Sequence, residues 1–237
     1  MNPMALKPYQ KIPIADCGEP LVPIPPDRFQ LWDPHPYAVL GAPYGDQSPF
    51  WVRSGVLDRL LQAAQWLAQQ QPGWQLAIFD AYRPLAVQQF MVDYTFAELA
   101  LMEGLDPVAL AQNPQHPQTQ ALRSRVSQFW ASPSDHPATP PPHSTGAALD
   151  LTLIDAAGRL LDMGSPIDEC SDRSFPDHFA PATDSQHQQF HAHRQLLRRA
   201  MAAGGFAQHA QEWWHFSWGD QLWADRTGQP LAHYGRA

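Results

Sequence analysis

The chain has 237 residues, 44% of them hydrophobic, and a formal net charge of −8. This length suits one compact domain with a sizeable core. Lys and Arg number only 15 together and form no long run, which excludes the basic surface of a typical nucleic-acid-binding protein.

The N-terminus contains no apolar stretch of signal-peptide length, and no window approaches the ~18 apolar residues of a membrane span. We therefore expect a cytoplasmic protein with no membrane attachment. The two cysteines, Cys17 and Cys170, lack the spacing of a structural zinc site, and we expect free thiols.

In chain order, the first elements follow an N-terminal arm. Residues 1–50 are rich in Pro and Gly and are expected to form an extended arm with short strands, one of them at residues 37–40. Apolar residues from Leu57 to Ala68 recur at helical spacing, which predicts a helix with Ser54 as its N-cap and Pro72-Gly73 as its stop. The apolar run at residues 74–80 predicts a buried strand.

Five more elements complete the prediction. Pro84 suits the first turn of a helix that runs to about Leu101, and a third helix is expected over residues 118–130. A Pro-rich loop precedes a strand at residues 146–154, a fourth helix covers about 184–203, and a last strand covers 212–218. The pattern is mixed α+β, and we expect residues 51–237 to form one compact domain with the arm packed on it.

The first constellation with chemical potential is His143 and Asp150, seven residues apart with small residues between them. Imidazole and carboxylate are both good zinc ligands, and Gly146 lets the backbone pass close to a metal or substrate. The alternative is a loop histidine and an aspartate that ends a strand at a turn.

The second constellation is Glu212-Trp213-Trp214-His215. A zinc hydrolase needs a histidine to fix the metal and a nearby glutamate to take a proton from water. On a turn that leads into a strand, the two side chains can converge. The alternative is an exposed glutamate and a core histidine among aromatic residues.

The third constellation is Asp80-Ala81-Tyr82-Arg83-Pro84, at the end of a predicted strand. Arg83 could bind a carboxylate or stabilise the oxyanion of a tetrahedral intermediate. A structural salt bridge between Arg83 and Asp80 is an equally good interpretation. The three constellations together supply three ligands, a base and a cation, which is the full requirement of a zinc hydrolase.

These motifs resemble those of the zinc D-alanyl-D-alanine dipeptidases of the VanX type. The resemblance rests on residues 80–84, the pattern His143-x-x-Gly146-x-Ala148-x-Asp150, residues 163–168 and residues 212–216, in the family's order. It implies a DD-peptidase/hedgehog-like zinc fold in which helices flank a small antiparallel sheet. It also implies hydrolysis of D-Ala-D-Ala or a related D-amino-acid dipeptide.

The resemblance implies roles for six residues, and two more are expected to bind substrate. One Zn²⁺ per chain is bound by His143, Asp150 and His215, Glu212 is the general base, and Arg83 stabilises the transition state. Asp168 recognises the free amino group of the substrate, and Tyr82 and Trp214 are expected to bind substrate. Where the family usually has Ser, two residues before the first metal histidine, this chain has Pro141, which affects substrate preference more than the metal site.

Two alternative functions stay open at this stage. One is a zinc carboxypeptidase or endopeptidase that acts on longer peptidoglycan peptides. The other is a non-catalytic binding module that keeps the metal for stability, although such a module needs neither Glu212 nor Arg83. His136, His178, His209 and His233 are expected in loops or on the surface, and His187, His191 and His193 on the solvated face of a helix.

Overall fold

A computed structural model describes residues 6–237, so the first five residues of the predicted arm lie outside it. A five-stranded sheet has the order β2-β4-β5-β7-β6. Its strands are β2 (Gln30–Leu31), β4 (Gln75–Asp80), β5 (Ala148–Ile154), β7 (His215–Ser217) and β6 (Ala207–Gln208). The pairs from β4 to β6 are antiparallel, as expected, whereas the short edge strand β2 runs parallel to β4.

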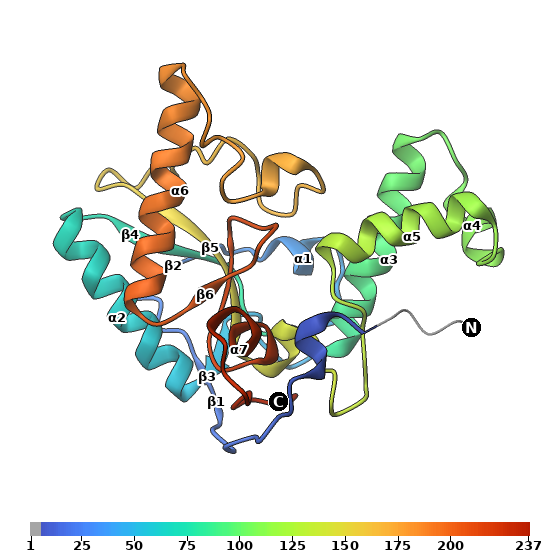
Figure 1. Ribbon diagram of the computed structural model, residues 1–237, viewed down its shortest axis with the longest axis horizontal. Helices are drawn as coiled ribbons and strands as arrows, with labels where there is room; N and C mark the ends of the chain where they lie inside the picture. The colour runs from blue at the N-terminus through green and yellow to red at the C-terminus, as the bar shows by residue number, and fades with distance from the viewer. Residues whose placement is uncertain (1–5) are drawn as a thin grey trace.

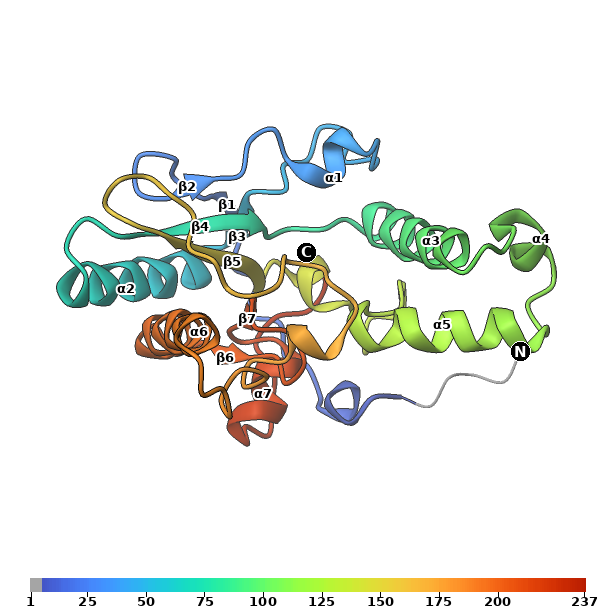
Figure 2. The same ribbon diagram turned by 90° about the horizontal axis from the view of Figure 1, so that it is seen from above.

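Helices lie in two groups around this sheet. The long helices α2 (Ser54–Gln70) and α6 (Ser185–Ala203) pack together on one face. A second group projects beyond the end of the sheet (Figure 2) and consists of α3 (Leu85–Met102), α4 (Pro107–Gln112) and α5 (Pro117–Phe129). Each group has its own apolar core, because Leu60 and Leu197 are buried under the sheet whereas Val87 and Leu122 are buried between α3 and α5. The observed fold is therefore mixed α+β.

The remaining elements are short. The arm contributes β1 (Leu21–Pro23), which pairs antiparallel with β3 (Trp51–Arg53), and the turn η1 (Pro8–Lys11). The others are α1 (Pro36–Val39), η2 (Pro142–Thr145), η3 (Asp172–Ser174) and α7 (Gln221–Thr227). In Figure 1, η1 lies beside α7, so a segment from the early part of the described chain contacts one from its late part.

The sequence prediction was wrong at three places. Residues 37–40 lie in and just after helix α1, because Pro36 starts a turn that buries Tyr37. Ser54 is the first helical residue and not the N-cap, and its hydroxyl donates to Glu19 instead. The last strand begins at His215, because its pairing with β5 begins where His215 faces Asp150.

Most other predicted boundaries are correct to within two residues. Helix α2 ends just before Pro72-Gly73, and α6 begins after Asp184, whose carboxylate caps it, and ends before Gly204. The short helices α4 and α7 were not predicted. Both cysteines are free. Among residues 6–237, none of the helices combines the length and apolar character that a membrane crossing requires.

Candidate metal and catalytic site

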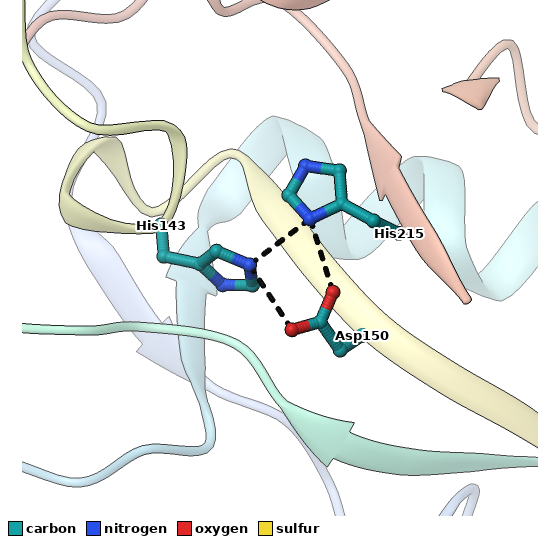
Figure 3. A group of neighbouring side chains, drawn as sticks. All are labelled: His143, Asp150 and His215. Carbon is teal, nitrogen blue, oxygen red and sulfur yellow. Dashed lines mark hydrogen bonds and ion pairs between the residues drawn. The ribbon is translucent and has the colours of Figure 1, made fainter. Parts of the chain in front are cut away.

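Three elements bring the predicted metal ligands together. Asp150 and His215 are directly paired neighbours on the antiparallel strands β5 and β7, and His143 lies on η2 just before β5. Figure 3 shows the three side chains pointing toward one another. Their ligand atoms all lie within 4.8 Å of one another, and all three residues are buried.

The distances among these atoms are short and nearly equal. His143 Nε2 is 3.1 Å from His215 Nδ1 and 3.2 Å from Asp150 Oδ2, and His215 Nδ1 is 3.0 Å from Asp150 Oδ1. Ligands around a tetrahedral zinc ion with bonds near 2.0–2.1 Å stand roughly 3.3–3.4 Å apart. The cluster therefore has nearly the spacing of a tetrahedral zinc site.

The tautomer of His143 supports the same interpretation. Its Nδ1 lies 2.7 Å from the Ala81 carbonyl oxygen, which can only accept, so Nδ1 carries the hydrogen. In a neutral ring, Nε2 is then a bare lone pair that faces the Asp150 carboxylate. Two acceptors at this distance repel each other unless a cation lies between them. This arrangement, with the second ring nitrogen held by a carbonyl, is usual for metal-binding histidines.

Electrostatics within the cluster also favour metal binding. Burial opposes the charge on Asp150, yet His143 and His215 hold the pKa of its carboxyl well below the usual value. Burial lowers the pKa of His215, although Asp150 opposes this effect, so its ring is neutral near pH 7. An ionised carboxylate beside a neutral imidazole is the protonation state that a divalent metal requires.

Glu212 lies beside this cluster in the loop that enters β7. Its Oε2 is 3.7 Å from His215 Nδ1, and its side chain is buried. Burial, followed by the carboxylates of Asp150 and Asp168, raises the pKa of Glu212 well above the usual value. A carboxylate with raised proton affinity, close to the metal ligands, is suited to accept a proton from water.

Arg83 follows β4 and faces the same cluster. Its Nη2 donates to Asp80 Oδ2 at 2.7 Å and to Asp150 Oδ2 at 3.2 Å, and its Nη1 donates to Gln88. Burial alone would lower the pKa of Arg83, but the net effect with Asp80 is to raise it. The structural interpretation of the sequence is therefore confirmed, since Arg83 forms a salt bridge with Asp80. Arg83 also lies at the site, where its contact with an oxyanion stays a prediction.

Asp168 lines the same cavity as Arg83, and the Tyr37 hydroxyl donates to its Oδ2 at 2.7 Å. Burial, together with the charge of Asp150, raises the pKa of Asp168 to about 7. Its φ is +66°, a left-handed conformation that non-glycine residues rarely adopt. Backbone strain of this kind often occurs where a side chain must be held in a fixed position for function.

A cavity of about 40 Å³ opens onto these groups. Of the predicted residues, seven line it: Arg83, His143, Asp150, Asp168, Glu212, Trp214 and His215. Tyr82 is buried but does not line this cavity in the part of the chain that the structure describes. A substrate contact through Tyr82 therefore has no support from the geometry of this cavity.

Several residues of this cavity were not predicted from the sequence. Lys7 and Tyr9 of the arm form part of its wall, and His209 lies with its Nδ1 3.5 Å from Glu212 Oε1. Burial lowers the pKa of His209 to about 3, so this ring is neutral near pH 7. Residues far apart in the chain supply this wall, and only the spacing of His209 three residues before Glu212 was visible in the sequence.

An α+β fold that holds a His/Asp/His cluster, a buried glutamate and an arginine in one cavity is typical of a metallopeptidase. Comparison with known proteins agrees. Residues 31–230 match the family model Peptidase M15, described as D-ala-D-ala dipeptidase. The chain belongs to this family.

Curated relatives carry the same description. A D-alanyl-D-alanine dipeptidase of Synechocystis sp. is 49% identical over 98% of this chain and 97% of that protein. One from Escherichia coli K12 is 33% identical over 62% of this chain and 56% of its own length. One from Enterococcus faecalis is 29% identical over 65% and 66% of the two chains.

Proposed function

We propose that this protein is a zinc-dependent dipeptidase that hydrolyses D-Ala-D-Ala. The observation that carries the proposal is the convergence of His143, Asp150 and His215 on one point, with Glu212 and Arg83 beside it in one buried cavity. The full-length similarity to a D-alanyl-D-alanine dipeptidase supports the choice of substrate.

Each side chain has a defined part in this reaction. One zinc ion per chain, held by His143, Asp150 and His215, would supply a Lewis acid for the scissile carbonyl and lower the pKa of water. Glu212 takes a proton from the attacking water and returns it to the leaving amine. Arg83, fixed by Asp80, stabilises the negative charge that develops on the carbonyl oxygen.

The free amino group of the substrate is assigned to Asp168. Its carboxylate is fixed by Tyr37 and lines the cavity, so it can form an ion pair with an ammonium group there. A buried ion pair forms only when both charges are present, so a blocked N-terminus leaves the Asp168 carboxylate unpaired. The need for a free amino group beside Asp168 should make the enzyme prefer dipeptides to internal peptide bonds of longer peptides.

Release of D-alanine from D-Ala-D-Ala, compared with N-acetyl-D-Ala-D-Ala, tests the proposal. We expect rapid release from the free dipeptide and a rate roughly 10- to 150-fold lower from the acetylated one, because loss of a charge-assisted hydrogen bond costs about 1.5–3 kcal/mol. Equal rates would favour the carboxypeptidase or endopeptidase alternative. Zinc binding without any hydrolysis would favour the binding module.

Two further expectations belong with this proposal. We propose that residues 51–237 form the peptidase domain and that residues 1–50 are an arm on it, supported by the pairing of β1 with β3 and of β2 with β4. A cytoplasmic location stays a prediction, and subcellular fractionation tests it.

A further inference from the structure

The cavity wall contains five basic side chains, and four of them already have a partner or are neutral. Arg83 donates through Nε, Nη1 and Nη2 to Asp80, Gln88 and Asp150. His143 and His215 face Asp150, and His209 is neutral near pH 7 because burial lowers its pKa to about 3. The fifth is Lys7.

Lys7 differs from the others because its ammonium forms no ion pair with any acidic side chain of residues 6–237. Burial lowers the pKa of Lys7, and Glu212 partly opposes this effect. A partly buried ammonium without an anionic partner is less favourable than one that is paired with an anion. An anion that enters the cavity would therefore be stabilised at this position.

Lys7 is held in place by contacts of the segment that follows it. Gln221 Nε2 on α7 donates to the Ile12 carbonyl at 2.6 Å and to the Ala138 carbonyl at 3.0 Å. The backbone N–H of Ala15 donates to the Ala232 carbonyl at 2.9 Å. Figure 1 shows η1, which begins at the next residue, against α7. The arm is therefore an anchored wall of the cavity.

Lys7 lines the same cavity as Glu212, the proposed base, and Asp168, the proposed partner of the substrate's amino group. The charges of both Asp168 and Lys7 influence the pKa of Glu212, so the base lies within electrostatic reach of both. The charge of Lys7 also contributes to the lowered pKa of His209. Both residues line the side of the cavity that is formed by the arm and the loop before β7. The cavity thus offers an anion for an ammonium group and, separately, a cation for a carboxylate.

We propose that Lys7 binds the C-terminal carboxylate of the dipeptide substrate and thereby limits the length of peptide that the enzyme accepts. This assignment rests on the proposed dipeptidase function. Two residues span at most roughly 7 Å, so a peptide with one additional C-terminal residue places a neutral amide where Lys7 requires a carboxylate. Lys7 is a specificity residue, and Glu212 and Arg83 are separate from this role.

The test compares D-Ala-D-Ala with its C-terminal amide, D-Ala-D-alaninamide, in the full-length zinc-loaded protein. Lys7→Met keeps the apolar stem and removes the charge. A charge-assisted hydrogen bond contributes about 1.5–3 kcal/mol, which corresponds to a KM increase of roughly 10- to 150-fold for D-Ala-D-Ala. We expect kcat to stay within about 3-fold and the kcat/KM of the amide to stay within about 3-fold.

The matched control is Lys11→Met, because Lys11 is an exposed lysine at the end of the same turn. It should leave both substrates unaffected. An equal loss of activity on acid and amide would show that Lys7 acts on Glu212 and would overturn the assignment. So would an unchanged KM in Lys7→Met. Absence of hydrolysis by the wild-type protein would instead overturn the dipeptidase function itself, and the role of Lys7 with it.

Discussion

Replacement of Asp80 by Ala should destabilise the protein and also impair catalysis. Asp80 is fully buried and accepts two hydrogen bonds from Arg83, at 3.0 and 2.7 Å, and further bonds with His35 and Tyr44 through Oδ1. Removal of one partner of a buried ion pair costs about 3–5 kcal/mol, because the other charge stays buried. Asp80→Ala also frees Arg83 from its fixed position beside Asp150.

The magnitude can be converted to a melting temperature. An unfolding entropy of about 2.1 cal/mol/K per residue gives roughly 0.5 kcal/mol/K for 237 residues, so Tm should fall by about 6–10 °C. We expect kcat/KM to fall by about 100-fold or more, as when a transition-state hydrogen-bond donor is lost. Differential scanning calorimetry and D-alanine release measure the two effects.

The matched control is Asp177→Ala. Asp177 also pairs with an arginine, Arg198, but the side chains are 58% and 38% exposed. A surface pair contributes at most about 1 kcal/mol, so Tm should change by less than about 2 °C and activity should be unchanged. If Asp80→Ala behaved like this control, the argument that Asp80 holds Arg83 for catalysis would be refuted.

Three other variants test separate parts of the account. Glu212→Gln should lower kcat by about 10²- to 10⁴-fold while zinc stoichiometry by atomic absorption is unchanged, and near-normal turnover would eliminate Glu212 as the base. In the metal-free protein, the raised pKa of Asp168, about 7, means that the folded state holds this proton more tightly than the unfolded state. Its stabilising contribution is therefore complete below about pH 4 and is lost as pH rises through about 7, and Asp168→Asn should reduce the fall in Tm between pH 5 and 8. No difference between the two proteins would contradict that pKa. Gly164→Ala should destabilise more than Gly158→Ala in urea denaturation, because both have positive φ but only at Gly164 would a Cβ overlap the Phe179 ring. Equal free energies of unfolding would disprove the packing argument.

The sequence predicted the long elements and the centre of the site because both leave local signals. The periodic apolar residues of α2 and the glycines that follow α6 are signals that lie within or next to the helix that they predict. Combined with family motifs, the local patterns around His143 and Glu212 predicted a cluster that the structure shows to be close in space.

The features that were missed depend on contacts between distant segments. Tyr37 lies in a helix because it packs beside Phe79 and Trp130 and donates to Asp168, 131 residues away. Lys7 reaches the cavity because α7 holds the arm near it. No local sequence pattern indicates such contacts between segments that are far apart in the chain. The same reason explains the Ser54 error, because Glu19, 35 residues away, takes the hydroxyl that would otherwise cap the helix.

The central claim is that a metal ion held by His143, Asp150 and His215 is required for hydrolysis of D-Ala-D-Ala. The most direct measurement is a zinc titration of the metal-free protein, followed by D-alanine release. The account predicts no release without zinc, full activity at one equivalent, and loss of both binding and activity in His143→Ala. Release by the metal-free protein, or no release from folded protein with one zinc bound, would contradict it.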